Sequence, residues 1–218
     1  MTSDATKFEY YNNVRPEVLA LVPAEARRVL DVGCGTGQLG ASIKRRQPCE
    51  VTGIEVLPDV GARAVELLDR VLIGDGQGLL AGFEDASFDC IVMADSLEHM
   101  VETDKVLAHC RRLLRAEGTL VVSLPNIRHW STVLMLLTGR WDYAEFGIMD
   151  RTHMRFFTIP SAIDLLKAHG FEHQEITATK LNNENLLARH LPAEVFARFD
   201  GLREESDFFQ FVIQARRT

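Results

Sequence analysis

Short apolar runs alternate with amphipathic stretches along the first 125 residues, so strands and helices should alternate too. Apolar runs predict five strands, over about 28–32, 51–56, 71–73, 89–94 and 119–124. Helical spacing predicts helices over about 11–21, 38–46, 58–68 and 103–115. Right-handed crossovers then give an α/β fold with a doubly wound, mostly parallel sheet of the Rossmann-like type. A ligand should bind where the strand order reverses, at the carboxyl ends of the strands.

The second half of the chain follows a different pattern. Residues 125–158 hold many aromatic side chains but no clean strand, so we expect a lid inserted after the fifth strand. A helix over 161–169 ends at Gly170, and a strand over 171–178 follows. A helical stretch, broken near Pro192, precedes a final strand over 208–214 that should run antiparallel.

These elements predict one domain built from four consecutive segments. They are an N-terminal cap (1–26), a cofactor-binding core (27–124), the acceptor-side lid (125–158) and the completion of the sheet (159–218).

Composition narrows the class of protein. A net charge of −7 argues against nucleic acid as the main partner. The four cysteines form no C-x-x-C pair, which favours reduced thiols in a cytoplasmic protein. The N-terminus is polar, without the features of a signal peptide. The longest apolar run, Val133 to Leu137, is too short for a transmembrane segment.

The most informative stretch runs from Val29 to Gly40 and predicts a buried strand, a glycine turn and a helix start. Glycines at 33, 35 and 37 let the backbone turn sharply with nothing projecting, so a flat ligand can lie against it. The same residues fit G-x-G-x-x-G, and Glu55 lies 20 residues beyond Gly35, where a dinucleotide's ribose would need it.

Carboxylates at successive strand ends favour a different cofactor. Asp31, before the first glycine, would repel a pyrophosphate but attract an ammonium and a sulfonium. Glu55 could take ribose hydroxyls, and Asp75, between two glycines, an adenine amine. Together with Asp95 at the fourth strand end, these positions describe S-adenosylmethionine. The alternative is that the four acids only cap helices and turns.

The same residues resemble a known family. Val29 to Gly37 resembles the first motif of class I S-adenosylmethionine-dependent methyltransferases, and Phe88 to His99 resembles their fourth-strand motif. Leu113 to Leu120 resembles the approach to their fifth strand. The resemblance covers about 28–124 and implies a seven-stranded sheet whose last strand is antiparallel.

A narrower resemblance continues downstream. Residues 123–126, Trp130 and residues 137–140 are similar to MetW-like methyltransferases, and 150–158 to methyltransferase domains found with polysaccharide glycosyltransferases.

The family resemblance implies roles for particular residues. Gly33, Gly35 and Gly37 would line the methionine half of the cofactor and Glu55 the ribose. Asp75 and Gly76 would lie by the adenine, with Asp95 facing the ligand. The helix over 11–21 would bring Tyr11 and Arg15 over the site, with Arg15 pairing with the ligand's carboxylate. Its alternative is an ordinary surface helix.

The acceptor side is less defined by sequence. His153 is the candidate general base, because imidazole titrates near neutrality, and Asp150 could orient it. The alternative is that His153 and Arg155 pair with surface carboxylates. His129 is the second candidate, whereas His99 suggests capping or packing. Apolar acceptor contacts could come from Trp130, Trp141, Tyr143 and Phe146, which could equally form a small second core. No metal-ligand spacing is apparent.

We therefore expect a methyltransferase that uses S-adenosylmethionine on a small molecule, at a hydroxyl of a sugar, lipid-linked or metabolic intermediate. A nicotinamide-dependent oxidoreductase and a cofactor-binding module that regulates a partner enzyme are the alternatives. The apolar segment Ser131 to Leu137 suggests a lid helix or homodimer contact in preference to a membrane-touching patch.

Overall fold

A computed structural model describes residues 13–180 and 186–218 of the chain. Seven strands form one sheet in the order β3-β2-β1-β4-β5-β7-β6. The strands are β1 (Arg28–Val32), β2 (Glu50–Glu55), β3 (Arg70–Ile73), β4 (Phe88–Ala94), β5 (Leu114–Pro125), β6 (Phe171–Lys180) and β7 (Phe208–Arg217).

The sheet confirms the predicted fold class. Strands β1 to β5 pair in parallel, and β7 lies antiparallel between β5 and β6. Because β1 has β2 on one side and β4 on the other, the chain reverses its direction of travel across the sheet at β1. A crevice at the carboxyl ends of β1 and β4 is the expected ligand position for this topology.

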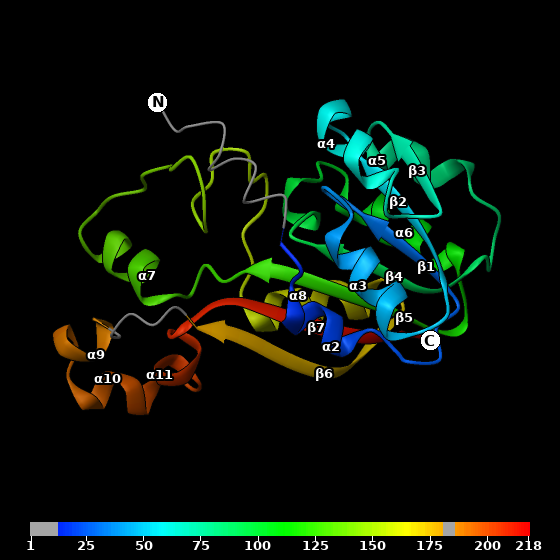
Figure 1. Ribbon diagram of the computed structural model, residues 1–218. Helices are drawn as coiled ribbons and strands as arrows, with labels where there is room; N and C mark the ends of the chain where they lie inside the picture. The colour runs from blue at the N-terminus through cyan, green and yellow to red at the C-terminus, as the bar shows by residue number, and fades with distance from the viewer. Residues whose placement is uncertain (1–12, 181–185) are drawn as a thin grey trace.

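Helices and short helical turns connect the strands and extend beyond them. They are α2 (Pro16–Leu21), α3 (Gln38–Arg46), α4 (Pro58–Ala64), α5 (Gly76–Leu79), η1 (Leu80–Gly82), η2 (Leu97–His99), α6 (Thr103–Leu113), α7 (Trp130–Leu137), α8 (Ile159–Ala168), α9 (Leu187–His190), α10 (Ala193–Arg198) and α11 (Leu202–Glu205). The segment from 126 to 158, with α7, lies beyond the carboxyl end of β5, and α9 to α11 lie beside α7 (Figure 1).

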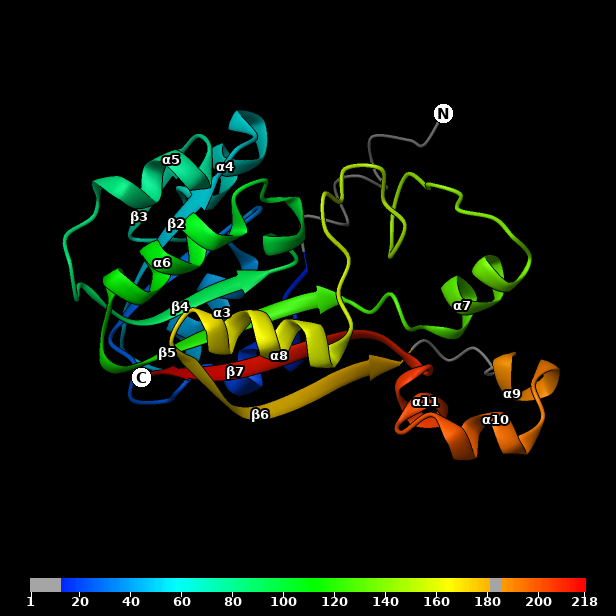
Figure 2. The same ribbon diagram turned by 180° about the vertical axis from the view of Figure 1, so that it is seen from behind.

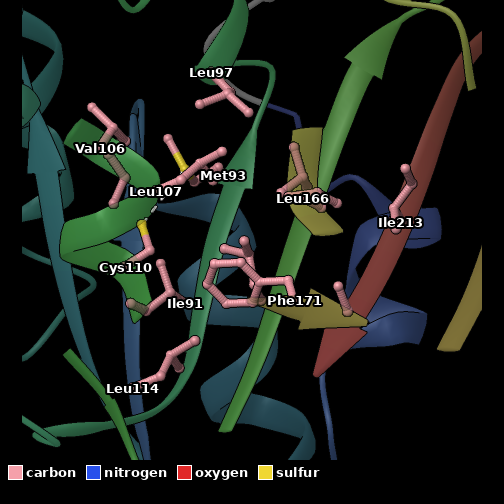
Figure 3. Packing of buried hydrophobic residues seen from close by; sticks show 14 of the residues in the cluster. Ile91, Met93, Leu97, Val106, Leu107, Cys110, Leu114, Leu166, Phe171 and Ile213 are labelled. Carbon is pink, nitrogen blue, oxygen red and sulfur yellow. Dashed lines mark hydrogen bonds between the residues drawn. The ribbon is translucent and has the colours of Figure 1, made fainter. Parts of the chain in front are cut away.

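Two apolar layers enclose the sheet. Helices α2 and α3 cover one face (Figure 1), whereas α6 and α8 cover the other (Figure 2). Successive side chains of β4 point to opposite faces of the sheet. Ile91 and Met93 belong to the layer that contains α6 and α8, and Val92 belongs to the layer that contains α2 and α3. Figure 3 shows the layer under α6 and α8, where Phe171 lies among side chains from β4, α6 and α8. Burial of these apolar side chains stabilises the sheet, and the sheet in turn holds the carboxyl ends of its strands in place.

Local sequence signals explain the helix ends. Helix α3 begins after Gly37, which adopts a φ of 83° that glycine tolerates without strain. Helix α8 begins with a capping box between Thr158 and Ser161, and Gly170 follows it with a φ of 75°.

Some predicted boundaries differ from the structure. The strand predicted over 119–124 starts earlier, at Leu114, and contains a bulge, because Phe88 pairs with Leu114 but Cys90 pairs with Thr119. The first helix is shorter than predicted, starting at Pro16, and the stretch after residue 186 forms three short helices. Tyr11 lies outside the described residues.

All four cysteines are free thiols, and Cys34, Cys90 and Cys110 are buried. Burial raises the pKa of the Cys110 thiol to about 12, so it stays protonated and packs as an apolar side chain. Within 13–180 and 186–218, no helix combines the length and apolarity needed to cross a bilayer.

Candidate active site

The glycine turn after β1 is closely packed on both sides. Gly33, Gly35 and Gly37 have φ angles of 81°, 56° and 83°, a backbone region that side-chain-bearing residues rarely adopt. A Cβ on Gly33 would lie 2.8 Å from the Cβ of Ser96, and one on Gly37 would lie 3.1 Å from Ala64. Backbone conformation therefore favours glycine at all three positions, and lack of space also requires it at Gly33 and Gly37.

Glu55 holds this turn against the end of β2. Its Oε2 accepts a 2.9 Å hydrogen bond from the Gly35 N–H, and its Oε1 accepts one of 2.9 Å from the Leu57 N–H. The side chain is buried. Since a carboxylate offers about four acceptor positions, Glu55 can shape the turn and still accept hydrogen bonds from a ligand.

Asp31 is a buried carboxylate without a partner. It is only 1% exposed, and neither oxygen has a hydrogen-bond partner among the described residues. Burial, together with the charge of Glu55, raises the pKa of Asp31 to about 7. An unpaired buried carboxylate costs free energy unless a proton or a cation meets it. A ligand ammonium at this strand end would supply that cation.

Asp75 and Gly76 lie at the third strand end. The exposed Asp75 caps α5, and its Oδ1 accepts a 3.1 Å hydrogen bond from the Gln77 N–H. Gly76 is buried against the ends of β1 and β2, where an added Cβ would lie 3.3 Å from Val32 Cγ1. The capping role that was the alternative explanation for Asp75 is therefore real, and its second carboxylate oxygen stays available to a ligand.

Arg15 and Asp95 form an ion pair that joins α2 to the sheet. Arg15 Nη2 donates to Ser123 Oγ at 2.7 Å, and Ser123 Oγ donates to Asp95 Oδ1 at 2.8 Å. Glu17 accepts a further bond from Arg15 Nε at 2.5 Å. The guanidinium thus already has carboxylate partners, and its predicted pairing with a ligand carboxylate would require a rearrangement. Asp95 has a φ of 53°, which places it at a sharp turn directly after β4.

Beyond Asp95, three side chains from two segments meet. Glu98 and His99 follow β4 on η2, and His153 comes from the lid segment. Glu98 Oε1 lies 3.9 Å from His153 Nε2, and the rings of His99 and His153 are 4.8 Å apart. Burial raises the pKa of Glu98 well above its ordinary range, and burial lowers the pKa of His153.

The orientation of His153 differs from the prediction. The turn before it is helical, since the His153 N–H donates to the Asp150 carbonyl at 3.0 Å. The Asp150 carboxylate, however, accepts from the N–H and the hydroxyl of Thr152 at 2.7 and 2.6 Å. The His153 ring is oriented instead by the Ile148 carbonyl, 3.0 Å from Nδ1.

His129 occupies a helix end. Its Nδ1 lies 2.8 Å from Ser131 Oγ and accepts the Ser131 N–H as the N-cap of α7. Burial lowers its pKa to about 4, and its ring contacts Trp130 and Phe209. An Nδ1 that accepts this bond places the ring proton on Nε2 in the neutral form. His129 therefore has a structural role, which competes with the predicted role as a base.

Aromatic side chains gather next to the His153 ring. Phe156 lies 6.2 Å from His153, 5.2 Å from Trp141 and 6.4 Å from Tyr143 between ring centroids. Trp141 and Tyr143 are 41% and 49% exposed, so they can still stack on a ligand. Trp130 packs against His129 instead.

The sequence analysis did not select Glu98 as a site residue, whereas the structure brings it close to His99 and His153. The only signal was the Glu-His pair directly after strand four, because His153 reaches it from a distant segment. A hollow of about 200 Å³ between Pro23, Asp89 and Arg115 lies at the amino ends of β4 and β5, away from these residues.

The seven-stranded sheet, with its antiparallel last strand, defines a class: α/β proteins of the Rossmann-like methyltransferase fold. The chain belongs to a family of methyltransferase domains, whose family model matches residues 7–176. It is an S-adenosylmethionine-dependent methyltransferase.

Known proteins of this kind match most of the chain. A demethylmenaquinone methyltransferase of Thermotoga maritima is 26% identical over 180 residues, covering 72% of this chain and 76% of that protein. A ubiquinone biosynthesis O-methyltransferase of Pasteurella multocida is 25% identical over 213 residues, covering 84% and 87%. The solved structure of a methyltransferase from Archaeoglobus fulgidus has the same fold, with a TM-score of 0.69, 16% identity and coverage of 99% and 100%.

These comparisons decide between the cofactors that the sequence left open. S-adenosylmethionine is the cofactor, and the nicotinamide alternative is wrong. The residues fit that cofactor, because the unpaired Asp31 carboxylate calls for a cation beside the glycine turn. The roles of the individual residues remain predictions.

Proposed function

We propose that this protein methylates a hydroxyl oxygen of a small molecule, either a sugar, a lipid-linked compound or another metabolic intermediate. The observation that carries the proposal is the buried cluster of Glu98, His99 and His153 beside the strand-four end. A hydroxyl is a weak nucleophile until its proton is removed, so an O-methyltransferase needs a proton-accepting or charge-stabilising group at that position. The O-methyltransferase name of a relative supports this choice.

Several residues would hold the cofactor in this proposal. Asp31 would meet its ammonium group, the turn at Gly33, Gly35 and Gly37 would lie under its methionine half, and Glu55 would accept from its ribose hydroxyls. Asp75 and Gly76 would border the adenine, with Asp95 at the neighbouring strand end. S-adenosylmethionine supplies an electrophilic methyl group on a sulfonium. The protein must align the acceptor behind that group and exclude water.

His153 is the candidate proton acceptor within the cluster. Its Nδ1 faces the Ile148 carbonyl, which can only accept, so the ring proton stays on Nδ1 and the lone pair on Nε2. Nε2 faces Glu98, so a proton taken there would be stabilised by the carboxylate.

The half-exposed Trp141 and Tyr143 support an acceptor that has a flat or apolar face. Rings of this kind stack on planar molecules and on the apolar faces of sugars. The net charge of −7 supports a small molecule over nucleic acid.

Helix α7 exposes apolar side chains to solvent. Its Leu136 and Leu137 are 50% and 61% exposed, which suits a lid that closes on the acceptor or a contact in a homodimer. The free cysteines are compatible with the expected cytoplasmic location.

Paired acceptors test the proposal. Release of S-adenosylhomocysteine is measured with sugar, quinol and lipid-linked alcohols, each beside its amine analogue and its O-methyl ether. We expect turnover with at least one free alcohol and none with the matching ether. Turnover of the amines alone, with every alcohol inert, would contradict the proposal. Trp141→Ala should raise KM for the accepted alcohol, whereas Phe199→Ala, which removes another exposed aromatic on a different segment, should not.

A further inference from the structure

We infer that Glu98, His99 and His153 form a binding site for one divalent transition-metal ion, with Zn²⁺ as the expected occupant. One carboxylate oxygen and two imidazole nitrogens lie within 4.8 Å of one another. Two histidines and one glutamate are a known ligand set for zinc in proteins with an open coordination position. Two nitrogen donors disfavour Mg²⁺ and Ca²⁺, which prefer oxygen ligands.

Glu98 is a buried carboxylate whose charge a bound cation would balance. Its side chain is 1% exposed, and neither carboxylate oxygen has a hydrogen-bond partner among the described residues. Asp95 and Asp150 add negative charge to its surroundings, and Arg15 offsets part of it. A buried carboxylate with its lone pairs unmet is costly, and a bound cation removes that cost.

The two histidines are arranged as metal ligands usually are. Nδ1 of His153 lies 3.0 Å from the Ile148 carbonyl. Nδ1 of His99 lies 3.2 Å from the Thr152 carbonyl and 3.1 Å from the Thr152 hydroxyl, which donates its own proton to Asp150. A carbonyl oxygen only accepts, so both Nδ1 atoms carry the ring proton and both Nε2 atoms carry a lone pair. Metal-binding histidines almost always donate their second ring N–H to such a partner, which fixes tautomer and orientation.

The nearest measured pair of ligand atoms in the cluster joins His153 to Glu98. His153 Nε2 and Glu98 Oε1 are 3.9 Å apart, too far for a hydrogen bond but close enough for two acceptors to repel. Ligand atoms around a zinc ion lie roughly 3.3 Å apart at metal–ligand distances of about 2.0 Å. Small side-chain rotations would therefore bring these atoms into coordination.

Backbone contacts hold the two segments in register. The N–H groups of Met154 and Arg155 both donate to the Glu98 carbonyl, at 2.9 and 3.2 Å. The site is thus built between η2 and the lid segment, directly after the end of β4. If the proposed function is right, the open positions of the ion would take the acceptor's hydroxyl oxygen and lower its pKa. In that case His153 Nε2 would bind the ion, and the ion instead of His153 would activate the hydroxyl.

Metal binding is tested on the full chain without cofactor or acceptor, so the result is separate from that of the methylation test. Chelator-treated protein is titrated with Co²⁺ and followed by visible absorption, then with Zn²⁺ in competition and with Mg²⁺ as a negative control. We expect one equivalent of Co²⁺ with the weak ligand-field bands of nitrogen and oxygen ligation, displaced by Zn²⁺ and not by Mg²⁺. Failure of the wild-type chain to bind Co²⁺ or Zn²⁺ stoichiometrically would overturn the inference.

Substitution of each proposed ligand tests where the ion binds. Glu98→Gln, His153→Gln and His99→Gln should each weaken Zn²⁺ binding by at least about 100-fold. His169→Gln is the matched control, because His169 Nε2 lies 3.4 Å from Asp104 Oδ1 in a histidine–carboxylate pair outside the cluster. Should the two more buried positions not fold when substituted, the half-buried His99 still decides the outcome. Zn²⁺ binding at wild-type affinity in a folded His99→Gln variant would contradict the proposed ligand set.

Discussion

At the scale of single residues, the site is defined by carboxylates whose neighbours differ. Glu55 has two backbone N–H partners, Asp95 has an arginine and a serine, and Asp31 and Glu98 have no hydrogen-bond partner among the residues described. All are acidic residues at or just after strand ends, yet only the unpaired ones are poised to bind a cation.

Asp31→Asn should increase stability at neutral pH and weaken cofactor binding. The pKa of Asp31 is about 7 in the folded chain and about 3.8 in the unfolded chain, so folding takes up a proton between these values. Its contribution to the free energy of unfolding therefore falls as pH rises from about 4 to 7 and is level above that range. The Asn variant should exceed wild type by on the order of 2–4 kcal/mol at pH 8, and by little at pH 4.

The same variant tests the cofactor role of Asp31. Loss of a charge-assisted contact should weaken S-adenosylhomocysteine binding by about 10- to 100-fold at pH 8. Urea unfolding across pH and calorimetric titration measure the two effects. The variant must be compared with wild type at each pH, because Glu98, whose pKa is also raised, likewise lowers the free energy of unfolding as pH rises. Unchanged affinity in a folded Asp31→Asn protein would remove Asp31 from the cofactor site.

His129→Asn should leave activity within about twofold of wild type. Asparagine is as good an N-cap as any residue, so α7 keeps its first-turn hydrogen bond. His129→Ala, which cannot cap, should lose about 1 kcal/mol of stability while remaining active. A 100-fold or larger fall in kcat for the folded Asn variant would restore His129 as a general base.

At the scale of elements, α2 is attached to the sheet by a polar network. Arg15, Asp95 and Ser123 come from before α2, after β4 and from β5, and their contacts are largely shielded from solvent. Breaking a buried ion pair by removing one partner leaves the other charge unpaired, at a cost of about 3–5 kcal/mol.

A double-mutant cycle measures this attachment. Arg15→Met and Asp95→Asn should couple by at least about 1.5 kcal/mol in urea unfolding, and asparagine tolerates the φ of 53° at position 95. Arg216 and Glu117, an exposed pair at 3.4 Å, provide the control cycle, with an expected coupling below about 1 kcal/mol. A coupling at the first pair no larger than at the control would mean that the network does not hold α2 in place.

At the scale of the whole molecule, the sequence predicted the first half better than the second. Strands β1 to β4 and the turn at Gly33 to Gly37 follow from local rules, namely apolar runs, glycine conformations and strand-end carboxylates. The cluster of Glu98, His99 and His153 depends on how the lid segment returns to the sheet. No periodicity encodes that path, so its geometry could not be predicted.

The sheet and the segment from 126 to 158 contribute different parts of the candidate site. The parallel strands carry the residues proposed to bind the cofactor, and the segment from 126 to 158 brings His153 and the aromatic side chains next to Glu98 and His99. Related folds can change acceptor by changing such segments while keeping the sheet.

Transfer of a labelled methyl group tests the central claim most directly. The protein is incubated with S-adenosylmethionine carrying a ¹³C-methyl group and the alcohol that supports turnover, and the product is examined by NMR and mass spectrometry. The account predicts a single ¹³C-methyl ether, formed in step with S-adenosylhomocysteine and lost in the Glu98→Gln protein. Label on nitrogen or carbon, or an undiminished yield from Glu98→Gln, would contradict it.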